Sequence, residues 1–308
     1  MGRYLGRHQT WLRVGLLAGL TVWGAEHASP AAAPQDSTRT IFVSVMGDKG
    51  TAVPDLAVTD LVLKEDGKVR DIVALRQATE QLHVALLIDD NGYGLGFIRQ
   101  GILDFVNGLR GRAEFAITTT SGRNIRLLDY TSDMQQLFPA INKLFARGQK
   151  GAYLLDGLME AANDMTRREF TRGVILAVTT EGEEFSGTRT EPILDAIERS
   201  RAQVYLINLG APTMGTMNPA SALRGESLLD EAGRRNVVFG AAPARSGGRA
   251  EQVVANSGIP MLMQQIATEL ACQYAVTYGT AIGGVGGKLS LDTRRKGVRV
   301  RAPQRAGG

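Results

Sequence analysis

The stretch from Val84 to Gly96 constrains the fold more than any other part of this chain. A short apolar run, Val84–Ile88, ends in Asp89 and Asp90, and a glycine-rich turn follows. Apolar residues then recur at helical spacing between Phe97 and Leu109. A continuous apolar run is typical of a strand that is buried on both faces, as in a parallel sheet. The stretch therefore predicts a strand, a polar turn and a helix, with the polar residues at the end of the strand where ligands bind in such sheets.

The chain repeats this alternation of strands and helices from residue 82 onward. The expected strands cover residues 82–88, 114–120, 124–128, 174–178 and 204–208. The expected helices cover residues 95–110, 131–147, 154–166, 191–201 and 260–271. This order predicts an α/β fold with a doubly wound, mostly parallel sheet that helices cover on both faces. Residues 210–258 are rich in Gly, Pro, Ala, Asn and Ser, and there we predict only one short helix, near 227–234.

The segments before and after this region have the pattern of short antiparallel strands. Residues 40–45 alternate in polarity, and Asp66-Gly67 separates two apolar runs, which is a hairpin signal. Short strands are also expected at 288–291 and 298–301. In the tail 294–301, charge alternates with valine as in a protected edge strand. We therefore predict a small β unit that the N- and C-terminal segments form together.

The chain begins with the pattern of an export signal. Arg3, Arg7 and Arg13 precede the apolar run Val14–Trp23, and small residues follow it in Ala28–Ala33. This pattern predicts a periplasmic or extracellular protein, with an uncleaved signal anchor as the alternative to a cleaved peptide. No second membrane span is expected. The predicted divisions are 1–33 for the signal peptide and linker, 34–80 for the small β unit, 81–280 for the α/β domain, and 281–308 for the C-terminal strands and basic tail.

Charge and cysteine content exclude several classes of protein. The net charge is +4, of which +2 lies in residues 1–33 and +6 in residues 288–308, so the middle of the chain carries −4. A basic nucleic-acid-binding face on the globular part is therefore not expected. The single cysteine, Cys272, excludes an intramolecular disulfide and a cysteine-based zinc cluster.

An ordered set of segments resembles one known family. The set comprises the leader, Leu61–Gly67, Val84–Asp89, Gly151–Leu158, Val174–Gly182 and Leu270–Tyr278. Together they resemble the bacterial von Willebrand factor A-related (VWA-like) family that is found widely in acidobacteria. The resemblance implies a VWA-like domain with a metal-ion-dependent adhesion site at the strand ends. It also implies a role in protein binding or cell adhesion rather than catalysis.

This chain departs from the family pattern at the metal site. The family supplies Asp-x-Ser-x-Ser, a threonine from a second loop and an aspartate from a third. Asp89 matches the first position, but Asn91 and Tyr93 replace the serines, Ala152 replaces the threonine, and Glu181 replaces the aspartate. Magnesium requires oxygen ligands in a strict octahedron. We therefore predict a degenerate site without a metal or other cofactor. If magnesium did bind, Asp89, Asn91 and Glu181 would hold it.

We predict that the loops after the strands bind a protein partner at the envelope or cell surface, and that the protein is not an enzyme. The expected binding residues are Asp89, Asp90, Asn91, Tyr93, Ala152, Tyr153, Glu181 and Glu183. Three alternatives remain open. The Asp89-Asp90-Asn91 turn would only cap the following helix. In the second alternative, the same turn belongs to the active site of a phosphate- or nucleotide-handling enzyme. In the third, the whole chain is a structural component of the envelope.

Overall fold

The structure is a computed structural model that describes residues 37–48, 50–146, 151–180, 182–210, 226–280 and 286–305. The chain divides into two units after Gln35, and the elements below all belong to the unit Asp36–Gly308. The predicted signal peptide and linker lie outside the described residues. Within the described ranges, no helix is both long enough and apolar enough to cross a membrane.

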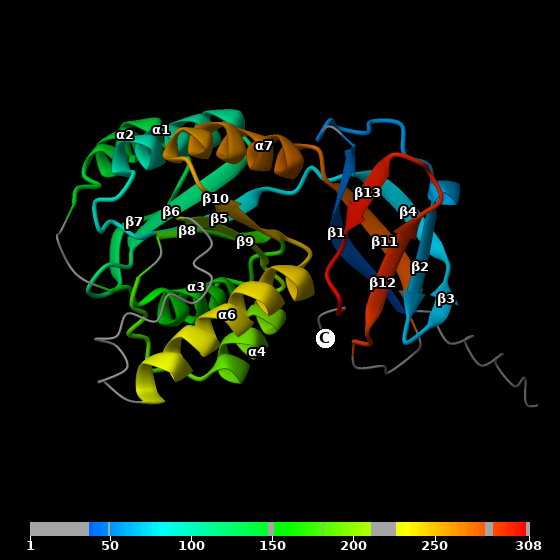
Figure 1. The fold of residues 1–308 in the computed structure, drawn as a ribbon. Coiled ribbons are helices and arrows are strands. Elements are labelled where there is room, and N and C mark those ends of the chain that lie inside the picture. The colour runs from blue at the N-terminus through cyan, green and yellow to red at the C-terminus, as the bar shows by residue number, and fades with distance from the viewer. Residues whose placement is uncertain are drawn as a thin grey trace, which may run out of the picture. The chain divides into compact units, whose positions relative to one another are not determined.

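A six-stranded sheet forms the centre of the α/β part (Figure 1). Its strands are β5 (Leu82–Ile88), β6 (Ala113–Thr119), β7 (Ile125–Thr131), β8 (Gly173–Thr180), β9 (Gln203–Leu209) and β10 (Arg249–Val253). They lie in the order β10-β9-β8-β5-β6-β7, and every neighbouring pair is parallel except β6 and β7. The chain continues from β5 to β6 on one side and later fills the other side with β8. The loops after β5 and β8 therefore meet where the strand order reverses, which is the usual place for a binding site in such sheets.

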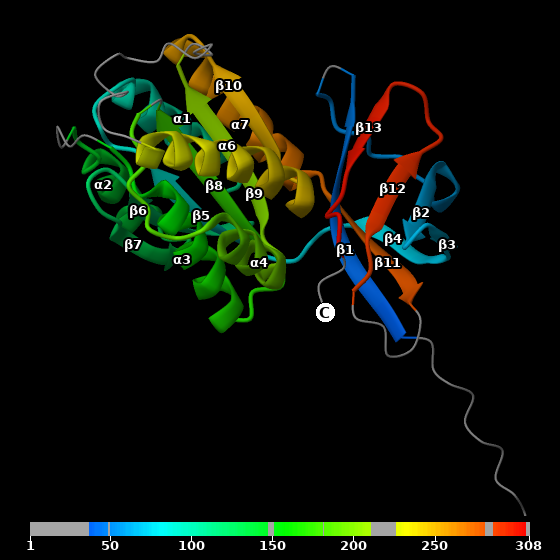
Figure 2. The ribbon, with the colours of Figure 1, turned by 60° about the horizontal axis from the view of Figure 1, so that its bottom comes forward.

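Helices cover both faces of this sheet (Figures 1 and 2). One face carries α1 (Leu95–Gly108), α2 (Met134–Asn142), the short 3₁₀ helix Asn256–Gly258 and α7 (Ile259–Ala271). The other face carries α3 (Leu154–Arg167), α4 (Thr190–Ser200) and α6 (Glu226–Ser246). Every residue of β8 is buried between the two layers, which explains its continuous apolar sequence. The predicted doubly wound α/β fold is confirmed.

The small β unit consists of two sheets with a shared apolar core. One sheet has the order β13-β1-β11-β4, with bounds Val298–Arg301, Ser37–Gly47, Tyr274–Thr280 and Ile72–Gln77. The other has the order β12-β2-β3, with bounds Leu289–Thr293, Leu61–Glu65 and Lys68–Arg70, and the 3₁₀ turn Val58–Asp60 precedes β2. Asp66 and Gly67 form the predicted hairpin turn, with φ angles of 51° and 77°. Strands from both termini build this unit, as predicted, and β13 lies at an edge.

A buried polar cluster joins the β unit to the α/β part within the unit Asp36–Gly308. The Gln273 side chain is fully buried, and its Nε2 donates to Ser44 Oγ at 3.0 Å and to Gln203 Oε1 at 2.6 Å. Its Oε1 accepts a hydrogen bond from Arg172 Nη2 at 2.9 Å. Because both ends of the buried Gln273 amide have partners, the cluster favours one arrangement of the strands that carry it.

Two predicted elements differ from the structure. The helix expected over 131–147 covers only Met134–Asn142, because Thr131 belongs to β7 and Asp133 is the N-cap, accepting a hydrogen bond from Gln135 N at 2.8 Å. Phe138 of this helix and Phe145 after its end are 40% and 60% exposed.

The second difference lies in residues 226–253, where we predicted one short helix. The structure has the long helix α6 followed by β10, a strand that the sequence pattern did not indicate. Val238 and Ala242 of α6 pack into the core beside α4, so tertiary packing outweighs the helix-breaking Gly240 and Pro243. β10 is a polar edge strand with one neighbour and therefore lacks an apolar run.

Candidate functional site

Asp89 lies directly after β5, and hydrogen bonds from two other strand ends occupy its carboxylate. Ser121 Oγ donates to Asp89 Oδ1 at 2.6 Å. Thr180 donates to Asp89 Oδ2 twice, from Oγ1 at 2.7 Å and from the backbone N–H at 3.1 Å. All three residues are buried. The carboxylate is therefore satisfied by protein donors, which stabilise its charge in a site shielded from water.

The loop before α3 lies between the other two strand ends and connects them. Ala152 N donates to Glu183 O, and Ala152 O accepts from Phe185 N, both at 2.8 Å. The next residue, Tyr153, donates its N–H to Thr120 O at 2.9 Å. Ala152 also forms isolated β-bridges with Ser121 and with Glu184. These backbone contacts hold the loops after β6 and β8 and the loop before α3 as one surface.

The turn after Asp89 is an Asx turn, but it does not cap the following helix. Asn91 Oδ1 accepts a hydrogen bond from Tyr93 N at 2.9 Å, and Asn91 Nδ2 donates to Thr180 Oγ1. The N-cap of α1 is Gly94, which has a φ of 64° and makes no side-chain capping bond. The alternative in which the acids cap α1 is therefore wrong, because the chain makes a left-handed turn between them and the helix.

Two charged residues outside the predicted set of binding residues, Glu184 and Arg235, are buried near the end of β8. Burial raises the pKa of Glu184, whose Oε1 accepts hydrogen bonds from Ser186 N at 3.2 Å and Ser186 Oγ at 2.5 Å. Arg235 of α6 donates to three oxygens at the end of β8: Gly182 O at 3.0 Å, Thr180 O at 2.6 Å and Thr179 Oγ1 at 3.3 Å. Arg235 stood in the segment that the sequence pattern left unassigned, so no local signal identified it.

The predicted binding residues are not equally accessible. Asp89, Asp90 and Ala152 are buried, Asn91 and Tyr153 are half-buried, and Tyr93 and Glu183 are exposed. Glu181 lies outside the described residues.

Four aromatic side chains are exposed in the segments that follow β5, α2 and β8. Tyr93 is 54% exposed, Phe97 46%, Phe145 60% and Phe185 37%. Tyr93 and Phe97 follow β5, and Phe185 follows β8. Phe145 follows α2, and its neighbour Ala146 packs against Gly92, where an added Cβ would lie 2.9 Å from the Ala146 Cβ. We call Tyr93, Phe97, Phe145 and Phe185 the aromatic rim.

The described residues do not fit the metal site that the family resemblance implies. Ala152 offers a methyl group where that site requires a hydroxyl, and its backbone N and O are already bonded. Both Asp89 oxygens accept hydrogen bonds from protein donors. Among the described residues, no group of three or more His, Cys, Asp or Glu is arranged to hold a metal ion. The described residues therefore do not form the metal-binding arrangement of that family at the end of β5.

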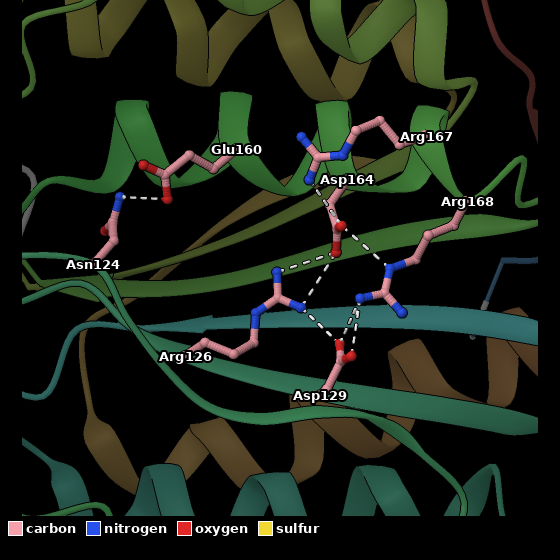
Figure 3. A network of polar contacts seen from close by, with 7 residues as sticks. All are labelled: Asn124, Arg126, Asp129, Glu160, Asp164, Arg167 and Arg168. Carbon is pink, nitrogen blue, oxygen red and sulfur yellow. Dashed lines mark hydrogen bonds and ion pairs between the residues drawn. The ribbon is translucent and has the colours of Figure 1, made fainter.

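A network of charged side chains joins α3 to β7, the edge strand of the sheet (Figure 3). Arg126 on β7 donates to Asp164 Oδ2 on α3 at 3.2 Å. Arg167 and Arg168, at the end of α3, donate to Asp164 Oδ1 at 3.0 and 3.2 Å. Arg168 also bonds both carboxylate oxygens of Asp129, at 3.0 and 2.9 Å. The network ties the antiparallel edge strand to a helix and shares no residue with the aromatic rim.

This network predicts a loss of stability in acid. Burial acts to raise the pKa of Asp164, but hydrogen bonds from Arg168 and Arg167 and the charge of Arg126 outweigh it and lower the pKa. Because the folded-state pKa is below the unfolded value, the stabilisation is present above the unfolded pKa and is lost as the pH falls through the folded pKa. We expect Asp164→Asn to lower the free energy of unfolding by about 1–2 kcal/mol at neutral pH. The variant should also lose less stability than the unchanged chain when the pH falls below about 4.

Urea unfolding at a series of pH values measures this effect. Asp129→Asn is the matched control, because the Asp129 side chain is 57% exposed and its ion pair is worth less than about 1 kcal/mol. The prediction would be contradicted if both variants lost the same free energy of unfolding. It would also be contradicted if the stability of Asp164→Asn fell in acid as steeply as that of the unchanged chain.

The fold and the loops together define an α/β domain whose polar loops meet at the reversal of strand order. No family model and no curated protein matches the sequence. Among solved structures, a von Willebrand factor type A protein from Catenulispora acidiphila is similar over 89% of this chain and 75% of its own, with 11% identity and a TM-score of 0.44. The VWA domain of SpRpn10 is similar over 59% of this chain and 94% of its own, with 14% identity and a TM-score of 0.41.

A third similar structure is proximal thread matrix protein 1 from the mussel byssus, with a zinc-occupied MIDAS motif. It is similar over 64% of this chain, with 14% identity and a TM-score of 0.43, and this chain spans 50% of its length. At these TM-scores and identities, none of the three likenesses indicates what this chain binds. The predicted bacterial and acidobacterial origin stays a prediction.

Proposed function

We propose that this chain is an exported, non-enzymatic VWA-like module that binds a protein partner at the envelope or cell surface without a metal. The binding surface is the aromatic rim with the neighbouring Tyr153 and Glu183. The observation that carries the proposal is the closed Asp89 carboxylate together with the exposed aromatic side chains of the segments that follow β5, α2 and β8. Aromatic side chains are enriched at protein interfaces, and exposed apolar groups often mark them.

The buried state of the acids supports binding rather than catalysis. Asp89 is 3% exposed and Asp90 1% exposed. A nucleophilic aspartate would need one free oxygen directed at its substrate, whereas both Asp89 oxygens accept hydrogen bonds. The rigid contacts among the three loops also favour recognition, because a preformed surface loses less entropy when a partner binds.

Capture of a partner by the immobilised full chain tests the proposal. The bait is exposed to the envelope and secreted proteins of the source organism, in the presence of either magnesium or a chelator. We expect one partner to bind equally well under both conditions. Tyr93→Ser/Phe97→Ser is expected to weaken its binding about 30-fold or more, because aromatic residues in such surfaces often contribute 2 kcal/mol or more.

The matched control is Val69→Ser/Val73→Ser, which removes two valines of the β unit that are 66% and 64% exposed. This variant is expected to bind like the unchanged chain. Binding that disappears with the chelator would refute the metal-free mode. Equal weakening in both double variants, or capture of no partner that depends on the rim, would refute the aromatic rim as the binding surface.

A further inference from the structure

A second candidate site lies at the other end of the sheet from Asp89. A cavity of about 680 Å³ opens at the amino ends of β8 and β9, beside Gly173 and Gln203. Residues 38–42 of β1 form another part of its wall, and all of its lining belongs to the unit Asp36–Gly308. Small-molecule sites commonly have volumes of roughly 300–1,000 Å³. The cavity is therefore large enough for a small organic ligand and is separate from the aromatic rim.

The wall of this cavity combines apolar side chains with arginines. Its apolar part includes Ile41, Phe42, Met165, Phe170, Leu194 and Ile197. Its charged part consists of seven arginines and three glutamates, a surplus of four positive charges. This composition differs from the middle of the chain as a whole, which has more acids than bases. The wall is suited to a ligand with an apolar body and a negative group.

Only some of these arginines are neutralised by carboxylates. Arg76 pairs with Glu80, and Arg305 pairs with Glu198 at 3.1 Å. Arg39 lies 3.8 Å from Glu65, which is outside the wall, and this pairing reduces the surplus to three. Arg199 and Arg245 are exposed, and neither side chain has an ion-pair or hydrogen-bond partner among the described residues. Their charges remain available to a ligand.

Arg172 adds a buried positive charge to the wall, and none of its hydrogen bonds goes to a carboxylate, although the charge of Glu80 acts on it from nearby. It is 5% exposed, and its Nη atoms donate to uncharged oxygens only: Glu80 O at 3.0 Å, Leu270 O at 2.6 Å, Gln273 Oε1 at 2.9 Å and Ala78 O at 3.5 Å. Its Nε has no partner. Burial lowers the pKa of Arg172 to about 10. This pKa is still well above neutral pH, so the group stays charged there. A buried cation whose hydrogen bonds reach no carboxylate is costly, and an anion in the cavity would stabilise it.

The helix ends near the cavity contribute a negative potential, which is weaker than the positive potential of the arginines. Helices α3, α4 and α6 end beside the cavity, and each C-terminus carries roughly half a negative charge. Their combined effect is smaller than the surplus of three charges. Ser200 Oγ and Ser246 Oγ already donate to the terminal carbonyls Ile197 O at 2.8 Å and Pro243 O at 3.2 Å. A net positive potential therefore remains in the cavity.

We propose that this cavity binds a small amphipathic anion, a carboxylate or phosphate monoester whose apolar body packs against Phe42, Phe170 and Ile197 and whose charged group lies among Arg172, Arg199 and Arg245. The ligand class follows from the wall and not from the aromatic rim. The proposal therefore holds or fails independently of the partner-binding function.

Calorimetric titration of the full chain with three matched ligands tests the proposal. The ligands are octanoate, octyl phosphate and octanol, which share one apolar chain and differ in the head group. We expect at least one anion to bind about 10-fold or more tightly than octanol, because a charge-assisted hydrogen bond to arginine is stronger than a neutral one. The tighter of the two anions identifies the head group.

Arg199→Ala/Arg245→Ala is expected to weaken the bound anion about 10-fold or more without changing the melting temperature. The matched control is Arg110→Ala/Arg294→Ala, which removes two exposed arginines outside the cavity and leaves the same net charge. It is expected to bind like the unchanged chain. Equal affinity for octanol and the anions, no binding of either anion, or equal weakening in both double variants would overturn the proposal.

Discussion

The Glu269→Gln variant is expected to lose about 3 kcal/mol of unfolding free energy, which is a large part of the stability of an ordinary domain. Glu269 of α7 is 2% exposed and lies between two arginines, Arg249 of β10 and Arg301 of β13. Its Oε1 also accepts a hydrogen bond from the buried Tyr205 OH at 2.8 Å. The variant keeps this bond but places an uncharged amide against two guanidinium groups. Arg301 loses the carboxylate that it pairs with, and Arg249 keeps only the more exposed Glu251.

Urea unfolding followed by circular dichroism measures this loss. Glu251→Gln is the matched control, because Glu251 pairs with the same Arg249 but its side chain is 37% exposed. That pair is worth less than about 1 kcal/mol. If both variants lost the same free energy, the buried position of Glu269 would not be what matters, and the prediction would fail.

The Asp89→Ala variant is expected to lose about 3 kcal/mol as well, whether or not magnesium is present. Ser121 Oγ, Thr180 Oγ1 and Thr180 N would all lose their acceptor in a buried place. Each hydrogen bond to a charged group contributes about 1.5–3 kcal/mol, and relief of the buried charge offsets part of the sum. The hydroxyls can rotate to other acceptors, but the backbone N–H of Thr180 cannot.

Unfolding of both proteins with and without magnesium measures this prediction. Asp195→Ala is the control, since Asp195 is an exposed acid within α4 and its replacement should change the stability by about 0.5 kcal/mol or less. A metal that bound Asp89 in the folded chain would raise its stability by mass action. A magnesium-dependent gain that Asp89→Ala abolishes would therefore show that the protein donors do not close the site.

The sequence pattern was sufficient for elements whose burial is uniform along the segment. β5 and β8 are buried on both faces and are continuous apolar runs, so their pattern identified them without a structure. The Asp66-Gly67 turn was also recognisable, because its left-handed φ angles favour these residue types. β10 and most of α6 were not recognisable, because an edge strand and a helix with internal Gly and Pro depend on their neighbours for stability.

The candidate site was predictable only in part. The position of Asp89 after β5 followed from the apolar run before it. Its partners Ser121 and Thr180 lie 32 and 91 residues away in sequence, and their hydroxyls meet the carboxylate only because β6 and β8 lie on either side of β5. The run of hydroxyl residues at the end of β6, Thr118–Ser121, was the one available signal for the first of them.

The sequence by itself determined the fold class and the place of the polar turn, since both depend on local periodicity and on the order of the elements. Only the tertiary structure decided which groups satisfy Asp89, which aromatic side chains stay exposed, and that Arg172, Arg199 and Arg245 line one cavity. The physical reason is that hydrogen bonds and electrostatic contacts act over a few ångströms in space. Distant segments come within that range only when the sheet is assembled.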